Sequence, residues 1–195
     1  MTAASGSPRD TGPSTASASV TDGQRFPIGR FERRDTFTAA ERATHVARIT
    51  ALPHKLAVAL DGLDEAQYDA PYRPEGWTIR QLVHHVADSH LNAYVRLKLA
   101  LTEYEPTIKP YDQDAWVELA DVRTVSPRVS LAMLTAVHER WVATMDGMTD
   151  AQFERALYHP ENGRMTIDQL LALYAWHGDH HVEHIVRARR GAAPS

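Results

Sequence analysis

The amino-acid sequence predicts an all-α fold, a four-helix bundle with a long connecting segment between its second and third helices. Four long segments carry apolar residues at helical spacing, and each has a recognisable start or end signal. No segment shows a convincing alternation of apolar and polar residues, so we expect no β-strand. The two halves of the chain also resemble each other, which favours two helix pairs packed into one bundle.

The first helix pair occupies the N-terminal half of the chain. The capping box Thr38-Ala-Ala-Glu41 predicts the start of the first helix, which should run toward Asp61-Gly62 with a kink at Pro53. The second helix should begin after its N-cap, Thr78, and end near Thr102. The apolar residues of this second helix recur at helical spacing: Ile79, Leu82, Val83, Val86, Ala93 and Leu97.

The second helix pair follows a polar, aromatic-bearing segment, residues 103–124. This segment is too long for a simple turn, so we interpret it as a functional loop or lid. The third helix should begin with Ser126 as N-cap and Pro127 in its first turn, and reach about Gly147. The fourth should begin at Thr166 and end in the basic run 187–190, which suits a helix C-terminus.

An internal repeat relates the two pairs. Residues 62–68 (GLDEAQY) resemble residues 147–153 (GMTDAQF), and residues 72–75 (YRPE) resemble residues 158–161 (YHPE). The dipeptide Thr-Ile then follows in both halves, at the predicted starts of the second and fourth helices. Each half is therefore expected to contain a long helix, a connector with a short helical turn, and a second long helix.

Three regions are expected along the chain: a disordered tail over 1–24, the bundle over 25–190, and a flexible C-terminus over 191–195. The tail consists of Ala, Ser, Thr, Gly and Pro with scattered charge, and it lacks the large apolar residues whose burial would offset the entropy of ordering. Neither a signal peptide nor a run of roughly 20 apolar residues is found. We therefore expect a cytoplasmic protein with no membrane partner.

Composition narrows the possible functions. The chain has 195 residues, 43% hydrophobic and 24% charged, which is typical of one soluble globular domain. Its 21 basic and 25 acidic residues give a formal net charge of -4, so a nucleic-acid partner is not expected. With no cysteine, the protein has no disulfide, no thiolate metal ligand and no thiol nucleophile of its own. A small-molecule substrate is the partner we expect.

The 11 histidines are the unusual feature of the composition. On the predicted fourth helix, His177 and His181 are four residues apart, so they share one face and can bind one metal ion. His180 and His184 form a competing pair with the same spacing. The helical projection places His177 and His181 beside the apolar stripe, and the competing pair farther from the core. Because metal sites in bundles are built from inward-facing side chains, we favour His177 and His181.

A third ligand must come from another helix, and the predicted second helix offers His84, His85 and His90. The internal repeat places His85 on the side of its helix that corresponds to His177, and His84 on the opposite flank, so we favour His85. His90 lies over the apolar stripe, as a buried histidine, a hydrogen-bond partner of a ligand or a replacement ligand. Three other histidines are expected to be solvated or packing residues: His45, His54 and His138.

A series of short motifs follows the same order and spacing through most of the chain. They are Arg25-Phe-Pro-Ile-Gly29, Pro71-Tyr-Arg-Pro-Glu-Gly-Trp-Thr78, Val83-His-His-Val-Ala-Asp-Ser-His90, Pro106-Thr-Ile-Lys-Pro-Tyr-Asp112, Tyr158-His-Pro160 and Tyr174-Ala-Trp-His177. Together these motifs resemble the YfiT group of the DinB-like superfamily.

The resemblance implies a DinB-like four-helix bundle, often a homodimer, with one divalent metal ion per subunit. Zinc is the first expectation for that ion and nickel the second. Carried over by position, the ligands are His85, His177 and His181, the set already favoured by periodicity and the internal repeat. The group carries the label of metal-dependent hydrolases, and similar proteins in the superfamily transfer bacillithiol or mycothiol or are thiol-dependent isomerases.

Three functions are compatible with such a site. Three neutral imidazoles leave a coordination position open, as in catalytic zinc sites, so activation of water by the metal is the first hypothesis. The sequence singles out no general base, and we consider Asp112, Asp88 and Glu183, with Asp112 as the candidate catalytic residue. The first alternative is an S-transferase that conjugates a low-molecular-weight thiol to an electrophile. The second is a non-catalytic binding module that the metal stabilises.

Overall fold

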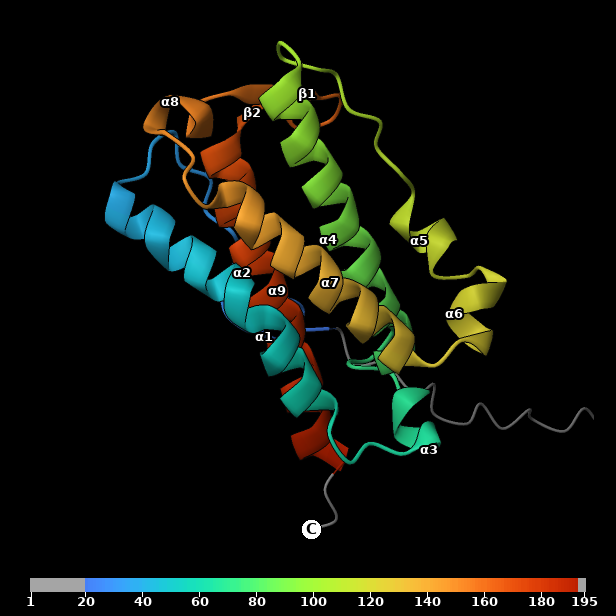
Figure 1. Ribbon diagram of the computed structural model, residues 1–195. Helices are drawn as coiled ribbons and strands as arrows, with labels where there is room; N and C mark the ends of the chain where they lie inside the picture. Colours follow the sequence, from blue (N-terminus) through green and yellow to red (C-terminus); the bar gives the residue numbers. More distant parts are fainter. Residues whose placement is uncertain (1–19, 193–195) are drawn as a thin grey trace, which may run out of the picture.

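The computed structural model describes residues 20–192, and the predicted four-helix bundle is confirmed (Figure 1). The bundle consists of α2 (Ala39–Leu60), α4 (Ile79–Thr102), α7 (Pro127–Met145) and α9 (Ile167–Ala192). Helix α9 packs mainly on α2, and α4 packs mainly on α7. None of the described helices is both long and apolar enough to cross a membrane.

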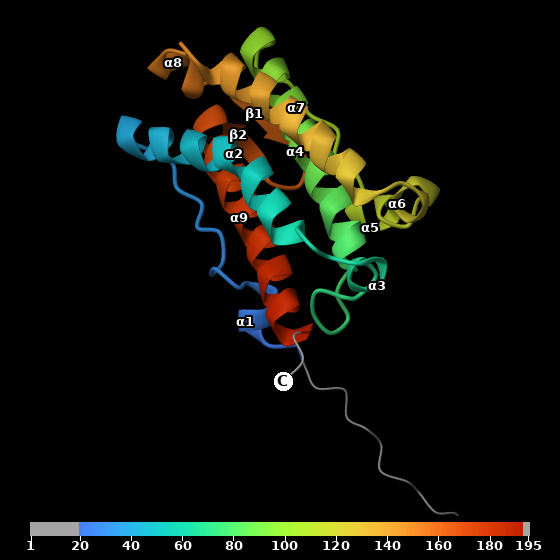
Figure 2. The ribbon, with the colours of Figure 1, turned by 60° about the horizontal axis from the view of Figure 1, so that its bottom comes forward.

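The helix starts follow the capping signals of the sequence. Thr38 and Glu41 form a reciprocal capping box at α2, and Thr78 forms another with Gln81 at α4. Ser126 caps α7, with Pro127 in its first turn. Helix α2 continues through Pro53, and Figure 2 shows that it changes direction along its length. The local start signals were therefore sufficient to place these helices.

Each half of the bundle has a short helix in its connector, as the internal repeat predicted. These helices are α3 (Glu65–Tyr68) and α8 (Asp150–Phe153), and each begins with a capping box. The repeat extends to the backbone, because the Ile79 amide donates to the Ala70 carbonyl just as the Ile167 amide donates to the Arg155 carbonyl. Equivalent backbone hydrogen bonds thus join the connector to the start of the second helix in each pair.

The prediction that the chain has no β-strand is wrong. Strands β1 (Ala156–His159) and β2 (Gly163–Thr166) form an antiparallel hairpin in which Ala156 pairs with Thr166. Each strand has only four residues, too few for an alternating pattern to be recognised. The dipeptide Asn162-Gly163, where the turn meets β2, is nevertheless a hairpin signal, and Gly163 adopts a φ of 73°.

The central segment, predicted only as a loop or lid, contains two short helices, α5 (Gln113–Trp116) and α6 (Ala120–Thr124). The hairpin holds its beginning, because the Ile108 amide donates to the Tyr158 carbonyl and the Tyr158 amide donates to the Pro106 carbonyl. Helix α6 packs against α4 at the other end, so the segment lies beside α4 (Figure 1).

The N-terminal segment lies along α9. Its first helix, α1 (Asp22–Arg25), overlaps the end of the predicted tail, because Thr21 and Gln24 form a capping box there. Backbone carbonyls of this segment accept hydrogen bonds from α9: His184 donates to Gln24 and Trp176 donates to Gly29. The rest of the predicted tail, 1–19, and most of the predicted C-terminal region, 193–195, lie outside the described residues.

Candidate metal centre

Three histidine side chains from two helices converge inside the bundle. His85 comes from α4, and His177 and His181 come from α9. The Nε2 atom of His177 lies 3.3 Å from Nε2 of His85 and 3.1 Å from Nε2 of His181. The structure therefore brings together the three residues that periodicity and the internal repeat favoured, and we call them the triad.

Helix geometry explains why these side chains meet. His177 and His181 are one turn apart, so both project from the same face of α9. Gly178 lies between them, where an added Cβ would stand 2.5 Å from Leu52 Cδ2 of α2. Asp179 also faces α2, where it binds Arg48 and Lys55 at 2.7 and 2.8 Å. Gly178 and Asp179 therefore hold this α9 turn on α2, while His177 and His181 face α4.

The alternative ligands on α4 have other contacts. The Nδ1 atom of His84 lies 2.7 Å from the Ser130 hydroxyl of α7, so this side chain faces away from the triad. His90 is completely buried, and its Nε2 lies 3.3 Å from Nδ1 of His177. His90 therefore contacts Nδ1 of His177, whereas Nε2 of His177 faces the other two triad histidines.

A chain of hydrogen bonds fixes the proton positions on His177. The Ile49 carbonyl lies 2.7 Å from Nδ1 of His138, and a carbonyl only accepts, so that nitrogen carries the proton. In neutral His138, Nε2 must then accept from Nδ1 of His90, 2.9 Å away. By the same logic Nε2 of His90 accepts from Nδ1 of His177. The remaining nitrogen of His177, Nε2, is left with a free lone pair directed at the triad.

Burial keeps these imidazoles neutral at pH 7. It lowers the pKa of His85 to about 4, and it holds the pKa values of His177, His181 and His90 well below the ordinary value for histidine. Neighbouring histidines act in the same direction on the last three, because two adjacent imidazolium charges would repel each other. A neutral imidazole is the form that binds metal, so the donor set fits a divalent cation.

His180 and His184, predicted to lie farther from the core, are buried instead. Their side chains are covered by segments outside the bundle: Phe26 approaches the ring of His180, and Tyr72 approaches the ring of His184. The ligand atoms of His180, His181 and His184 also lie within 4.8 Å of one another. The helical projection did not foresee this second cluster, because it describes the bundle core and not the segments that cover it.

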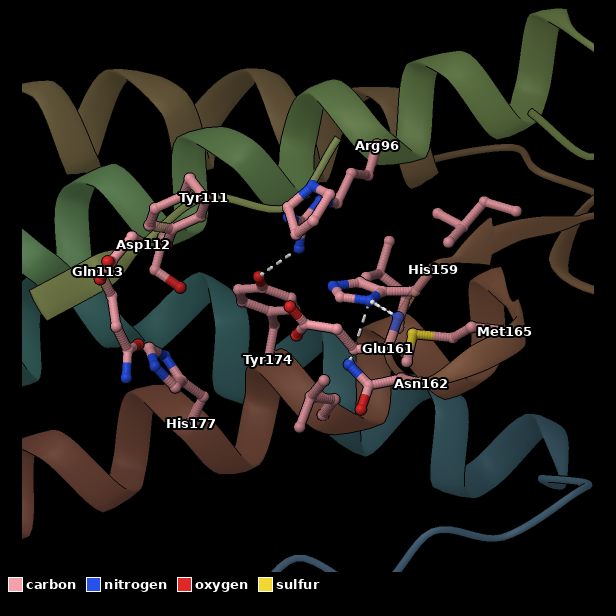
Figure 3. A pocket seen from close by; sticks show the side chains of 15 residues that line it. Arg96, Tyr111, Asp112, Gln113, His159, Glu161, Asn162, Met165, Tyr174 and His177 are labelled. Atoms are coloured by element: carbon pink, nitrogen blue, oxygen red, sulfur yellow. Dashed lines mark hydrogen bonds between the residues drawn. The ribbon is translucent and has the colours of Figure 1, made fainter. Parts of the chain in front are cut away.

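Two cavities border His177. The larger has a volume of about 650 Å³ and lies between α4, α9, the hairpin and residues 110–113 (Figure 3). The smaller has a volume of about 380 Å³ and is lined by the connector 72–77 and by all three triad histidines. Gln113 borders both cavities. A small molecule therefore has room to reach the triad from two sides.

The three candidate proton acceptors occupy different positions. Asp112 lines the larger cavity together with His177, although one of its oxygens already caps α5 by accepting from two backbone amides. Burial and the nearby Asp121 carboxylate raise the pKa of Asp88 to about 6, but Asp88 lines neither of the two cavities. Glu183 is paired with Arg187 at 2.8 Å. Among these three, Asp112 is the carboxylate that shares a cavity with the triad.

Sequence reasoning missed two residues that contribute to this region. His138 was expected only to pack or to be solvated, yet it anchors the hydrogen-bond chain to His177. Arg96 points into the larger cavity and was not considered. Each occupies an apolar position of its helix, since His138 fits the buried series Leu134, Trp141 and Met145. A polar residue within an apolar stripe is the signal that identifies both.

Comparison with known proteins places this geometry in a family. Residues 48–185 match the model of the DinB superfamily. The chain is 43% identical over 166 residues to a Bacillus subtilis (strain 168) protein named "Putative metal-dependent hydrolase YfiT", covering 85% of this chain and 93% of that protein. A Bacillus cereus (strain G9842) protein of the same description is 46% identical over 166 residues, with coverage of 85% and 95%.

Solved structures agree with these matches. YfiT from Bacillus subtilis, described as a probable metal-dependent hydrolase with an unusual four-helix bundle topology, superposes with a TM-score of 0.85 at 42% identity. The match covers 89% of this chain and 99% of that one. A four-helix bundle protein, TT2238, gives a TM-score of 0.50 at 22% identity, with coverage of 72% and 94%. This second likeness concerns the fold alone.

Proposed function

The chain belongs to the DinB superfamily, and we propose that it is a metal-dependent hydrolase acting on a small molecule. One divalent ion would be held by His85, His177 and His181. The observation that supports this most directly is the convergence of three imidazole nitrogens, since Nε2 of His85 and Nε2 of His181 both lie within 3.3 Å of Nε2 of His177. Such a cluster of neutral donors is stabilised by a cation, and the YfiT relatives are named for a metal-dependent activity.

The metal would supply Lewis acidity, since zinc held by three protein nitrogens lowers the pKa of water to about 7 and polarises a carbonyl or phosphoryl oxygen. The protein's own contribution is to hold the ligands. His90 keeps the proton of His177 on Nδ1, and burial keeps the triad neutral. Both cavities are lined by His177 and Gln113, so the substrate would approach the triad through one of these cavities.

We propose Asp112 as the group that accepts a proton or orients the substrate in this reaction. Its position on the rim of the larger cavity supports the role, and one carboxylate oxygen is not used by the α5 cap. Asp112→Asn should preserve the cap, because asparagine is an equally good N-cap residue. We expect turnover to fall while metal content stays unchanged. Equal turnover in Asp112→Asn and the wild-type protein would remove Asp112 from the mechanism.

Transfer of a low-molecular-weight thiol is the second candidate function. A hydrolase needs one organic substrate, whereas a transferase must hold two, and two cavities meet at His177. The chain has no cysteine, so any reacting thiol would come from a cosubstrate. A thiol that binds a divalent metal loses its proton and becomes a nucleophile at neutral pH.

Elemental analysis followed by two activity probes tests these proposals. The metal-loaded protein would be incubated with an aryl ester and with chlorodinitrobenzene, each with and without a low-molecular-weight thiol. Consumption of the ester without thiol supports hydrolysis, whereas consumption only with thiol supports transfer. Loss of both activities in His85→Ala, but not in the half-buried His45→Ala, would link turnover to the triad. Bound metal without either activity contradicts both enzymatic proposals.

The identity of the metal, the oligomeric state, the cellular location and the class of partner are four further proposals. We propose zinc as the resident ion and nickel as the second possibility, because imidazole accepts both and availability often decides. A homodimer follows from the resemblance to the YfiT group and is tested by sedimentation equilibrium. We further propose a cytoplasmic location and no nucleic-acid partner, in keeping with the acidic net charge of -4.

A further inference from the structure

The larger cavity contains a buried cation that forms no ion pair with any carboxylate of residues 20–192. Arg96 projects from α4 into this cavity and is only 9% exposed (Figure 3). Among residues 20–192 its one hydrogen-bond partner is the Tyr174 hydroxyl, a neutral group 3.4 Å from Nη1. No carboxylate in this part of the chain forms an ion pair with Arg96. Burial of a guanidinium with so few partners costs free energy, unless a ligand supplies the missing hydrogen bonds and negative charge.

Arg42 shows how the same fold treats a structural arginine. Its guanidinium binds both carboxylate oxygens of Asp168, at 2.7 and 2.8 Å, and also Asp150, at 2.6 Å. These bonds join α2 to the start of α9. Arg96 has no comparable role, because its single bond joins two helices that already pack through apolar residues. The contrast shows that Arg96 does not join elements of the fold through carboxylates as Arg42 does.

Two further hydrogen-bond donors face the same space. The Nδ1 atom of His159 accepts from the Glu161 amide at 3.2 Å and lies 3.3 Å from Nδ2 of Asn162, so the proton of the neutral ring is on Nε2. Figure 3 shows this second nitrogen turned toward Tyr174. Because the Tyr174 oxygen already accepts from Arg96, its own proton is free to donate. Arg96, His159 and Tyr174 thus turn hydrogen-bond donors and one positive charge toward this space. The Glu161 carboxylate also lines it and is drawn extending toward Tyr174 in Figure 3.

The cavity also has apolar walls and acidic residues on its rim. The apolar side chains that line it are Leu157, Met165, Leu170 and Leu173. Asp112 and Glu161 line it too, but both are exposed to solvent, whereas Arg96 and His159 are buried. The deep part therefore suits an anion attached to an apolar group, and the acidic rim disfavours a ligand that is negative along its whole length.

We propose that the larger cavity binds a small molecule through an oxyanion, a carboxylate or a phosphate, held by Arg96, Tyr174 and His159. Tyr174 precedes His177 by three residues on α9, about 4.5 Å along the helix axis. An oxyanion bound there leaves the rest of the molecule extending toward the triad. That orientation rests on the proposed function, whereas the binding of the oxyanion does not depend on any reaction.

Calorimetry with the full-length, cobalt-loaded protein tests the proposal, using charged and neutral probe pairs. Hexanoate is compared with hexanamide, and phenyl phosphate with phenol. We expect one of the two anions to bind roughly 10- to 100-fold more tightly than its neutral partner, the range for hydrogen bonds to a charged group. The pair that shows the difference identifies the carboxylate or the phosphate as the oxyanion.

Arg96→Met, which keeps an unbranched side chain without charge, should abolish the preference for the anion. Arg140→Met, at an exposed arginine of α7, is the matched control and should leave it intact. The visible spectrum of cobalt reports whether the anion binds the metal instead. A spectral change with the preference retained in Arg96→Met would overturn the proposal, and so would the absence of any preference. Neither result depends on hydrolytic activity, so the proposed function is judged separately.

Discussion

Two clusters of three histidines share His181 of α9, but their nitrogens have different surroundings. The triad with His85 and His177 joins two helices, and Nε2 of His177 lies close to both other Nε2 atoms. The second cluster adds His180 and His184 from α9 alone. In that cluster the Nδ1 atoms of all three histidines are buried without a hydrogen-bond partner among the described residues.

The difference shows that proton positions, and not proximity alone, distinguish a ligand set from a packed cluster. A neutral imidazole has one lone pair. If His181 directs that lone pair from Nε2 to the triad, its Nδ1 carries a proton and cannot bind a second ion. His184 donates from Nε2 to the Gln24 carbonyl, which leaves a lone pair on Nδ1. The second cluster therefore has at most two available lone pairs while the triad is occupied.

The largest effect is expected from replacing the triad member that the second cluster lacks. His85→Ala should weaken metal binding roughly 100-fold or more, because a ligand contributes more than the hydrogen-bond partners that orient it. His184→Ala is the matched control in the second cluster, and it should retain one ion per chain. Metal content after dialysis against a weak chelator measures both. If His85→Ala kept its bound metal and His184→Ala lost it, the metal would belong to the second cluster and not to the triad.

A smaller effect is expected from the hydrogen-bond chain behind His177. His138→Phe removes the group that accepts from His90, so His177 loses its fixed proton position, and metal affinity should fall roughly 10- to 100-fold. His138→Gln keeps one donor and one acceptor and should restore most of the affinity. Imidazole ¹⁵N shifts should show the proton of His177 on Nδ1 in the wild-type protein and in His138→Gln. An equal loss of metal affinity in His138→Phe and His138→Gln would mean that His138 contributes by packing and not by its hydrogen bonds.

The smallest effect concerns the pH dependence of stability in the metal-free protein. Burial lowers the pKa of both His138 and His184 to about 4, whereas histidine in an unfolded chain titrates near 6.5. Between about pH 6.5 and pH 4 the unfolded chain therefore binds protons that the folded chain does not. The free energy of unfolding should fall on acidification by up to about 1.4 kcal/mol per pH unit for each such histidine.

Chemical denaturation at pH 5 and pH 7 measures this slope and compares the two regions. His138→Gln and His184→Gln should each reduce the slope by a similar amount, since each removes one buried neutral imidazole. The slope of the wild-type protein should be steeper than that of either variant. Equal stability of the wild-type protein at both pH values would contradict the burial of these rings.

The sequence predicted what depends on local signals. The capping box at Thr38 and the N-cap at Thr78 placed two helix starts, and the internal repeat favoured His85 over His84. The sequence did not predict the hairpin, because its four-residue strands are too short to show a pattern and are held by their pairing across the turn at residues 160–162. The correct predictions depend on interactions between residues close together in the chain or on the repeat between the two halves.

Contacts between distant segments could not be predicted in the same way. The burial of His180 and His184 depends on Phe26 of the N-terminal segment and Tyr72 of the connector lying against α9, and no local pattern encodes these positions. Arg96 illustrates the same limit, because only the tertiary structure shows that the hairpin and α9 surround it and that no carboxylate of residues 20–192 forms an ion pair with it. Charge and polarity within an apolar stripe identify such residues as candidates, but their partners come from the tertiary structure.

Anomalous diffraction from crystals of the zinc-loaded protein tests the central claim most directly. Data collected on either side of the zinc absorption edge locate the ion without assumptions about its ligands. We predict one strong peak per chain, at about 2.0 to 2.1 Å from the Nε2 atoms of His85, His177 and His181. A peak bound by His180 and His184, or one that does not contact His85, would contradict the assignment of the metal to the triad.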